Sequence, residues 1–161
     1  MLKSILSSKD CAVCRFCCSF RRQSLWETPL FDKKTKESLE KKYPEAKFKT
    51  AGNESFTVDL LHLYKTDGSE EEAACPFLGE SGCVLTADEK PFDCSIWPLR
   101  AAKINGKVHV MLENTCPAIN KQPFKNVENL VKSGLGEKIT AYAEKNPDSI
   151  KEIQEGFKVI F

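Results

Sequence analysis

Half of the chain's eight cysteines lie in one short stretch, CAVCRFCC, which holds Cys11, Cys14, Cys17 and Cys18. In a C-x-x-C pair, the two-residue gap lets a tight turn aim both sulfurs at one ion while backbone N–H groups donate to the thiolates. Such pairs recur in zinc and iron–sulfur sites, and three cysteines at this repeat match the first three ligands of a ferredoxin-type cluster. The stretch therefore predicts metal binding.

The adjacent residues Cys17 and Cys18 leave the ligand set of this stretch unfinished. Neighbouring side chains point to opposite sides of an extended chain and lie about 100° apart on a helix, so these two sulfurs are poorly placed to share one tetrahedral ion. On a continuous helix, Cys11, Cys14 and Cys18 would share a face instead. Sulfurs must then come from elsewhere in the chain. The remaining candidates are Cys75, Cys83, Cys94 and Cys116.

The cysteine count leaves several metal arrangements open. Eight thiols fit two four-thiolate zinc sites, one iron–sulfur cluster with one zinc ion, or one metal site with spare thiols. Cys75 and Cys116 each precede a proline, as the fourth ligand of a ferredoxin-type cluster commonly does. Disulfides in an exported protein are a competing hypothesis, and so is a redox C-x-x-C, although the βαβ context of that motif is missing.

Charged residues and histidines near these motifs add little chemistry of their own. A thiolate centre needs cations and N–H donors around it, and basic residues close in sequence could supply the charge. These residues are Arg15, Arg21, Arg22, Lys90 and Arg100. His62 and His109 fall in expected strands, where we interpret them as exposed or hydrogen-bonded residues and not as ligands. No serine or carboxylate constellation indicates a catalytic mechanism, so we lean against an enzyme.

Composition bounds the class of protein. The chain has 161 residues, 24 Lys and Arg against 23 Asp and Glu, and a net charge of +1. This length fits one domain, residues 1–161, and the balanced charge creates no field that would attract nucleic acid. The sequence contains neither the apolar segment of a signal peptide nor the run of about 18 apolar residues that spans a membrane. We therefore expect a cytoplasmic protein with reduced thiols and no nucleic-acid or membrane partner.

Local patterns predict a small α+β fold. Lys33–Tyr43 is rich in helix formers and stops at Pro44, which indicates an exposed helix. Phe56–Lys65, with its β-branched and aromatic residues, predicts a strand. The proline- and glycine-containing segment Cys75–Arg100 predicts loops held by side-chain contacts.

The C-terminal half carries the clearest signals. Asn105-Gly106 stands between two strand-like runs and predicts a hairpin with a type I′ turn. From Phe124 to Tyr142 apolar residues recur at helical spacing, interrupted near Gly134 and Gly136, and GFKVIF at 156–161 could add a final strand. The expected architecture is a single domain with a β-hairpin-containing sheet, C-terminal helices and cysteine-rich metal-binding loops.

Taken together, the cysteine segments resemble the CxxCxxCC family, the YkgJ-like domain described as zinc- or iron-chelating. CAVCRFCC matches the motif of the name, CPFLGESGCVL resembles the family's C-P-F-L…G-C block, and PFDCSIWP resembles its R-P-x-x-C-R-x-x-P block. Lys90 and Ser95 depart from the two arginines of that last block, which puts any role of those arginines in doubt but leaves the sulfurs untouched. The resemblance implies a metal centre of zinc or iron–sulfur type, with Cys116 as an eighth ligand, and relatives that include flagellin lysine methylases.

Our hypothesis is a cytoplasmic protein that binds zinc, an iron–sulfur cluster or both, with the metal organising the fold. The expected ligands are Cys11, Cys14, Cys17, Cys18, Cys75, Cys83, Cys94 and Cys116. The alternative is an iron–sulfur enzyme or accessory protein that acts in electron transfer or in methylase-like modification of a partner. The partner that the sequence indicates is the metal ion, and the sequence does not identify a protein partner.

Overall fold

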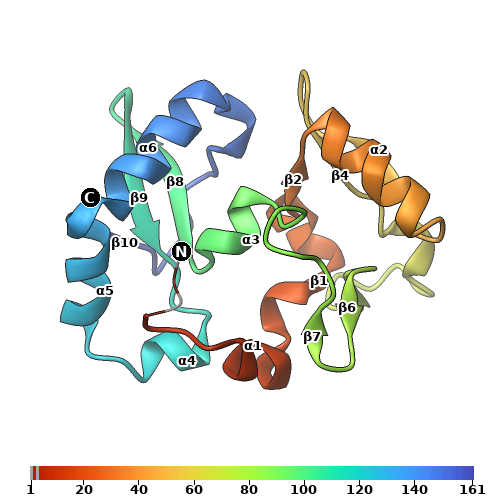
Figure 1. Ribbon diagram of the computed structural model, residues 1–161, viewed down its shortest axis with the longest axis horizontal. Coiled ribbons are helices and arrows are strands. Elements are labelled where there is room, and N and C mark those ends of the chain that lie inside the picture. The colour runs from red at the N-terminus through yellow and green to blue at the C-terminus, as the bar shows by residue number, and fades with distance from the viewer. Residues whose placement is uncertain (1, 3) are drawn as a thin grey trace. The chain divides into compact units, whose positions relative to one another are not determined.

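The structure, a computed structural model, describes residues 2 and 4–161. Its helices and antiparallel sheets confirm the predicted α+β class (Figure 1). The chain forms two compact units: residues 11–94, here the cysteine unit, and residues 95–161 with the N-terminal segment through Asp10, here the hairpin unit. The single domain expected from the chain length stays a prediction.

The cysteine unit combines one long helix with short strands. Helix α1 (Ser8–Cys14) and a 3₁₀ turn (Phe16–Cys18) precede β1 (Ser19–Arg21), a second 3₁₀ segment (Arg22–Glu27), β2 (Leu30–Phe31) and α2 (Lys33–Lys42). Strands β3 (Phe48–Thr50), β4 (Phe56–Val58), β5 (Glu72–Ala74), β6 (Leu78–Gly79) and β7 (Gly82–Cys83) follow. They form antiparallel sheets in the orders β2-β4-β3, β1-β5 and β6-β7.

Helix α2 confirms the helix predicted from Lys33 onward. The side chain of Asp32 accepts a hydrogen bond from Thr35 N at 2.8 Å and so caps the first turn. Leu39 on the same helix is fully buried in the core of the unit. The rings of Phe31 and Phe77, 5.9 Å apart at their centroids, belong to the same core. One apolar face therefore holds this otherwise exposed helix in place.

The strand predicted over Phe56–Lys65 is wrong beyond Val58. Asp59 Oδ1 accepts a hydrogen bond from Leu61 N at 3.1 Å, a local turn that ends the strand. Leu61–Leu63 then forms a 3₁₀ turn, which places His62 on an exposed turn and not in a strand. Tyr64 returns to the core, and its hydroxyl donates to Phe20 O at 2.7 Å.

The hairpin unit is built on the strands β8 (Leu99–Ile104) and β9 (Lys107–Leu112), with β10 (Lys158–Val159) on the outer side of β9. Asn105 and Gly106 have φ values of 49° and 82°, so both adopt the left-handed conformation that the type I′ turn requires. The predicted hairpin and final strand are thus confirmed. The short helix α3 (Phe92–Ile96) precedes β8 and spans the boundary between the units.

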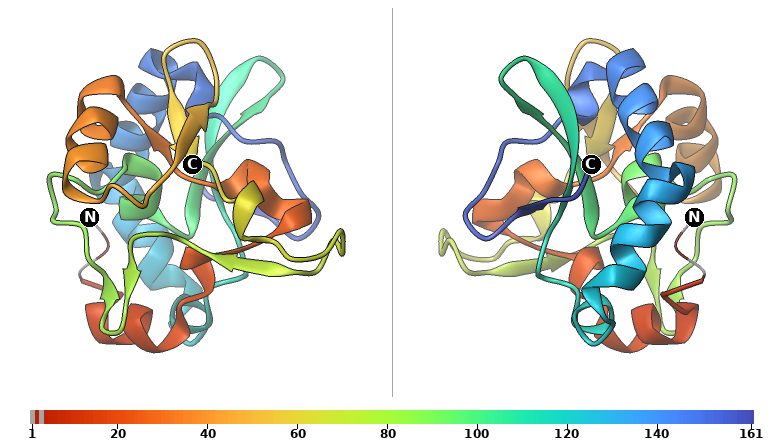
Figure 2. Two further views of the ribbon diagram at one scale, coloured as in Figure 1. Left: turned by 90° about the vertical axis from the view of Figure 1, so that its right-hand side faces the viewer. Right: turned by 90° about the vertical axis from the view of Figure 1, so that its left-hand side faces the viewer.

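Helices cover the sheet of the hairpin unit. After α4 (Pro117–Asn120), helix α5 (Phe124–Leu130) runs through a π-helical segment (Val131–Leu135) into α6 (Gly136–Lys145). This confirms the interrupted helix that the two glycines predict. Helix α6 contacts β8 and β9 through a buried stripe that includes Ile139 (Figure 2).

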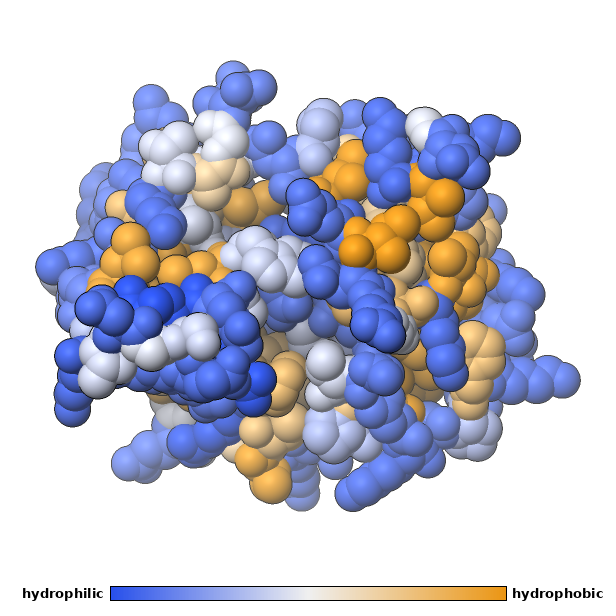
Figure 3. All heavy atoms as spheres, turned by 180° about the vertical axis from the view of Figure 1, so that it is seen from behind, coloured by the Kyte–Doolittle hydropathy of each residue, from blue (hydrophilic) through white to orange (hydrophobic). Residues whose placement is uncertain are grey.

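A buried ion pair joins the two long strands of the same unit. Arg100 Nε lies 3.2 Å from Glu113 Oε1, and the two side chains are 4% and 0% exposed. On the face shown in Figure 3, most side chains are hydrophilic and apolar side chains gather in a few patches. Over the residues that the structure describes, no helix combines the length and the apolar character needed to cross a bilayer.

Candidate metal centre

The opening cysteines lie on two separate helical turns. Helix α1 carries Cys11 and Cys14 and ends at Cys14, and the next residue, Arg15, has a left-handed φ of 54°. The following 3₁₀ turn carries Cys17 and Cys18, and Cys18 N donates to Arg15 O at 3.0 Å. Because Arg15 breaks the helix, the four cysteines do not share one continuous helical face.

Strand pairing brings the opening stretch to Cys75. Strands β1 and β5 are antiparallel, with Ser19 opposite Ala74. One residue beyond this pair, Cys75 N donates to Cys18 O at 2.7 Å. The ladder therefore places the 3₁₀ turn that carries Cys17 and Cys18 beside the start of the second cysteine segment.

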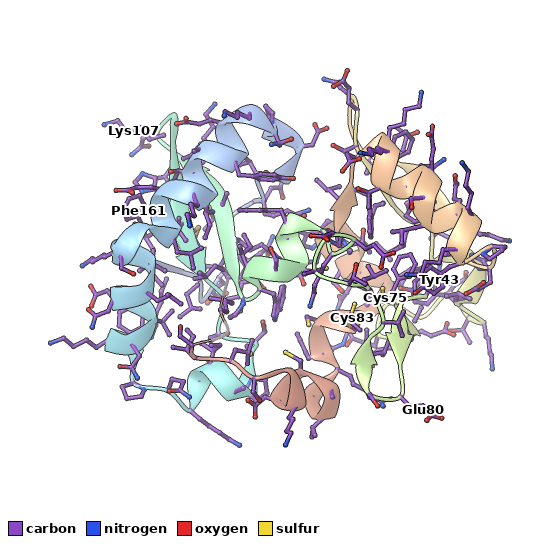
Figure 4. The ribbon with its side chains drawn as sticks, in the orientation of Figure 1. Tyr43, Cys75, Glu80, Cys83, Lys107 and Phe161 are labelled. Atoms are coloured by element: carbon purple, nitrogen blue, oxygen red, sulfur yellow. The ribbon has the colours of Figure 1, made fainter. Side chains whose placement is uncertain are left out.

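A tight hairpin then returns the chain toward Cys75. Leu78 N donates to Cys75 O at 2.9 Å, which closes a turn over the Cys-Pro-Phe segment. Strands β6 and β7 pair Leu78 with Cys83. Figure 4 shows Cys75 and Cys83 close to each other at the base of this hairpin, with Glu80 at its tip.

The thiol of Cys75 interacts with two other thiols of the unit. Burial is the main reason that its pKa is raised to about 12, while the Phe77 backbone N–H that donates to the sulfur acts in the opposite direction. The charges of Cys83 and Cys17 raise the pKa further by repulsion. Three cysteines distant in sequence are therefore electrostatic neighbours, and one already accepts an N–H···S hydrogen bond of the kind that stabilises thiolate ligands.

Helix α1 packs against the same hairpin. Gly82, with φ of 102°, lies so near the helix that an added Cβ would stand 3.4 Å from both Cα and Cβ of Ala12. Arg15 Nε donates to Ala12 O at 3.1 Å, and its Nη2 donates to Glu80 O. A small residue on each side and one bridging guanidinium thus hold the turn that carries Cys11 and Cys14 against the strand that carries Cys83.

The other two predicted ligands lie on other elements of the chain. Cys94 lies half-buried on α3, at the end of the cysteine unit. Cys116 is buried in the hairpin unit, where it precedes α4. The structure contains all eight side chains as thiols. In the described part of the chain, no three Cys, His, Asp or Glu side chains are arranged to hold a metal ion.

Most of the basic residues expected near the sulfurs have other partners. Arg21 forms ion pairs with Glu70 and Glu72 at 3.3 and 3.6 Å. The Arg22 guanidinium lies 4.5 Å above the Tyr64 ring. Unlike Arg21 and Arg22, Arg15 forms hydrogen bonds to both helix α1 and the β6–β7 hairpin.

Sequence reasoning named Arg15 only as a nearby charge and Gly82 only as part of the G-C block, without a structural role for either. Their structural roles depend on a contact between segments far apart in the chain, for which the local sequence carries no signal. His109, the second histidine considered above, has its Nδ1 3.1 Å from Phe161 O in the hairpin unit, which agrees with a hydrogen-bonded residue.

Comparison of the chain with protein-family models, with curated proteins and with solved structures finds no match to any of them.

Proposed function

We propose that the cysteine unit binds a metal centre through a nucleus of Cys17, Cys75 and Cys83. The observation that carries the proposal is the convergence of their segments: Cys75 N donates to Cys18 O at 2.7 Å, beside Cys17, and Cys83 lies close to Cys75 (Figure 4). Clustered thiols repel one another as thiolates, and a cation that displaces their protons removes that repulsion. Cys11, Cys14 and Cys18 lie on the turns packed around this nucleus and are the next ligands that we propose.

An all-sulfur donor set suits zinc or an iron–sulfur cluster, because thiolate is a soft ligand. For Cys94 and Cys116 the proposal rests on the sequence pattern alone. The protein would work in a reducing compartment, the cytoplasm, where these thiols are available to the metal.

Metal analysis after anaerobic purification tests the proposal. We expect zinc, or iron with labile sulfide, in stoichiometric amount. Sulfide together with a visible absorption that dithionite bleaches would favour the alternative of electron transfer or partner modification, whereas zinc alone would favour a structural site. Two outcomes would refute the metal-binding proposal. One is purified protein that contains neither zinc nor iron, and the other is a thiol count in denatured protein that shows the cysteines paired as disulfides.

Two cysteine variants test where the metal binds. Cys75→Ser and Cys83→Ser each remove one thiolate of the nucleus, so we expect at least about a tenfold loss of metal affinity. Ala74→Ser is the matched control, because it adds a hydroxyl at the exposed neighbouring position and keeps every sulfur. Full metal content in Cys75→Ser would contradict the proposed nucleus.

Removal of the metal tests its role in folding. If the centre ties α1 to the β6–β7 hairpin, binding free energy is also folding free energy. We expect a chelator to lower the melting temperature of the cysteine unit and to increase the exchange rates of its backbone amides. An unchanged cooperative melt after complete metal removal would show that the metal does not organise the fold.

A further inference from the structure

A pocket of about 290 Å³ opens in the hairpin unit between the end of β9, helices α4 and α5, and strand β10. Its floor is apolar: Leu112, Ile119 and Val127 line it and are each at most 7% exposed. Phe124, which precedes Val127 by one turn on α5, also lines it and is 44% exposed. The size and the apolar lining are those of a site at the lower end of the range for small molecules.

A single lysine supplies positive charge at this pocket. Lys158 on β10 is the register partner of Leu112 on β9, so the two side chains project from the same face of the sheet. Lys158 Nζ lies 5.6 Å from the centroid of the Phe124 ring, within the range of a cation–π contact. The ammonium is thus held beside the apolar lining and not extended away from it.

Amide side chains make up the rest of the polar lining. Asn114, Asn120 and Gln122 line the pocket together with Lys158. Asn120 Nδ2 donates to Asn114 O at 2.6 Å, which fixes the segment that joins β9 to α4. None of the described residues that line the pocket is an aspartate or a glutamate. The polar groups are therefore amides and one cation. Their N–H donors and positive charge match a negatively charged group that accepts hydrogen bonds.

We infer that this pocket binds a small monocarboxylate with an apolar body. The carboxylate would pair with Lys158 and the amide donors, and the apolar body would cover Leu112, Ile119 and Val127. One lysine balances one negative charge, whereas phosphate groups are typically held by several cations or by the fork of an arginine. None of the described residues that line the pocket is a proposed metal ligand, so the inference does not rest on the proposed metal centre.

The test is a titration of the full-length protein with phenylacetate, followed by the NMR signals of backbone and side-chain amides. We expect saturable shifts centred on Asn114 and Gln122, with a dissociation constant of about 1 mM for so small a ligand. Lys158→Gln should weaken phenylacetate binding about tenfold through the lost charge-assisted contact. Phenylacetamide, the neutral isostere, should bind Lys158→Gln and the parent protein equally.

Lys107→Gln is the matched control, because it removes an exposed ammonium at the opposite end of β9 (Figure 4). This variant should bind phenylacetate like the parent protein. Lys158 is itself exposed on an edge strand, and the amide spectrum of Lys158→Gln checks that the variant is folded. The inference is overturned if the NMR shifts do not saturate or lie outside the pocket. It is also overturned if Lys158→Gln weakens the binding of phenylacetate and phenylacetamide equally, or if Lys158→Gln and Lys107→Gln weaken phenylacetate binding equally.

Discussion

Replacement of Gly136 by alanine tests how closely Phe161 packs on the start of helix α6. A Cβ at this position would lie 2.6 Å from Phe161 Cγ and 2.8 and 2.9 Å from its two Cδ atoms, well inside van der Waals contact. The backbone of Phe161 is held beside β9, so the ring can give way only by rotation of its own side chain. Val110 N donates to Phe161 O at 2.9 Å, and Ile160 N donates to Val110 O at 2.9 Å.

Two opposing effects set the size of the change. Alanine favours a helix over glycine by about 1 kcal/mol, since it loses less backbone entropy on folding. Overpacking against the ring costs about 1–3 kcal/mol. We therefore expect Gly136→Ala to destabilise the hairpin unit by about 1 kcal/mol. In a Phe161→Ala background the ring is gone, so the same substitution should stabilise the unit by about 1 kcal/mol.

Urea denaturation of the four proteins of this double-mutant cycle measures the coupling. Trp97 lies in the hairpin unit and Trp26 in the cysteine unit, so Trp26→Phe in all four proteins leaves one fluorescent reporter for the unit of interest. A coupling energy of about 1–3 kcal/mol and a reversal of sign are expected. If Gly136→Ala stabilises both backgrounds equally, Phe161 does not pack on Gly136 and the reasoning fails.

Three further substitutions test other parts of the structure. Glu113→Gln removes the carboxylate that pairs with the buried Arg100 guanidinium and should destabilise the protein by about 3–5 kcal/mol in urea denaturation, while replacement of both residues by apolar ones should cost less. Leu39→Ala removes a fully buried side chain from the core of the cysteine unit and should cost about 2–5 kcal/mol, and a cost under about 1 kcal/mol would contradict that burial. Hydrogen bonds from the backbone N–H of Lys65 and the hydroxyl of Thr66 hold the pKa of Glu71 below its ordinary value of 4.5, so its contribution to stability is present above that pH and is lost as the pH falls through the folded-state pKa. The parent protein should therefore lose stability more steeply than Glu71→Gln as the pH falls below about 4.5, and parallel curves would refute this.

Local signals predicted several elements because their causes act over a few residues. The Asn105-Gly106 turn adopts left-handed φ values that these two residue types tolerate best. Helix α2 begins at the cap of Asp32 and continues through helix-forming residues. The same kind of cause also explains the error at Asp59, whose side chain ends β4 by bonding to Leu61 N, a turn that β-propensity alone does not reveal.

The cysteines and their C-x-x-C spacing predict thiolate ligands for the candidate centre, and local patterns predict the α+β class. The spacing does not show which sulfurs lie close together in space, because it constrains only cysteines that are near one another in the chain.

The tertiary structure shows which cysteine-bearing segments lie beside one another. Pairing of β1 with β5 brings the opening stretch to Cys75, and the β6–β7 hairpin brings Cys83 to the same place. The contact of Gly82 with Ala12 adds α1 to the group, and the break at Arg15 separates the opening cysteines into two turns. The β1–β5 pairing and the contact of Gly82 with Ala12 join segments that lie tens of residues apart, and no local pattern of residue types encodes such contacts.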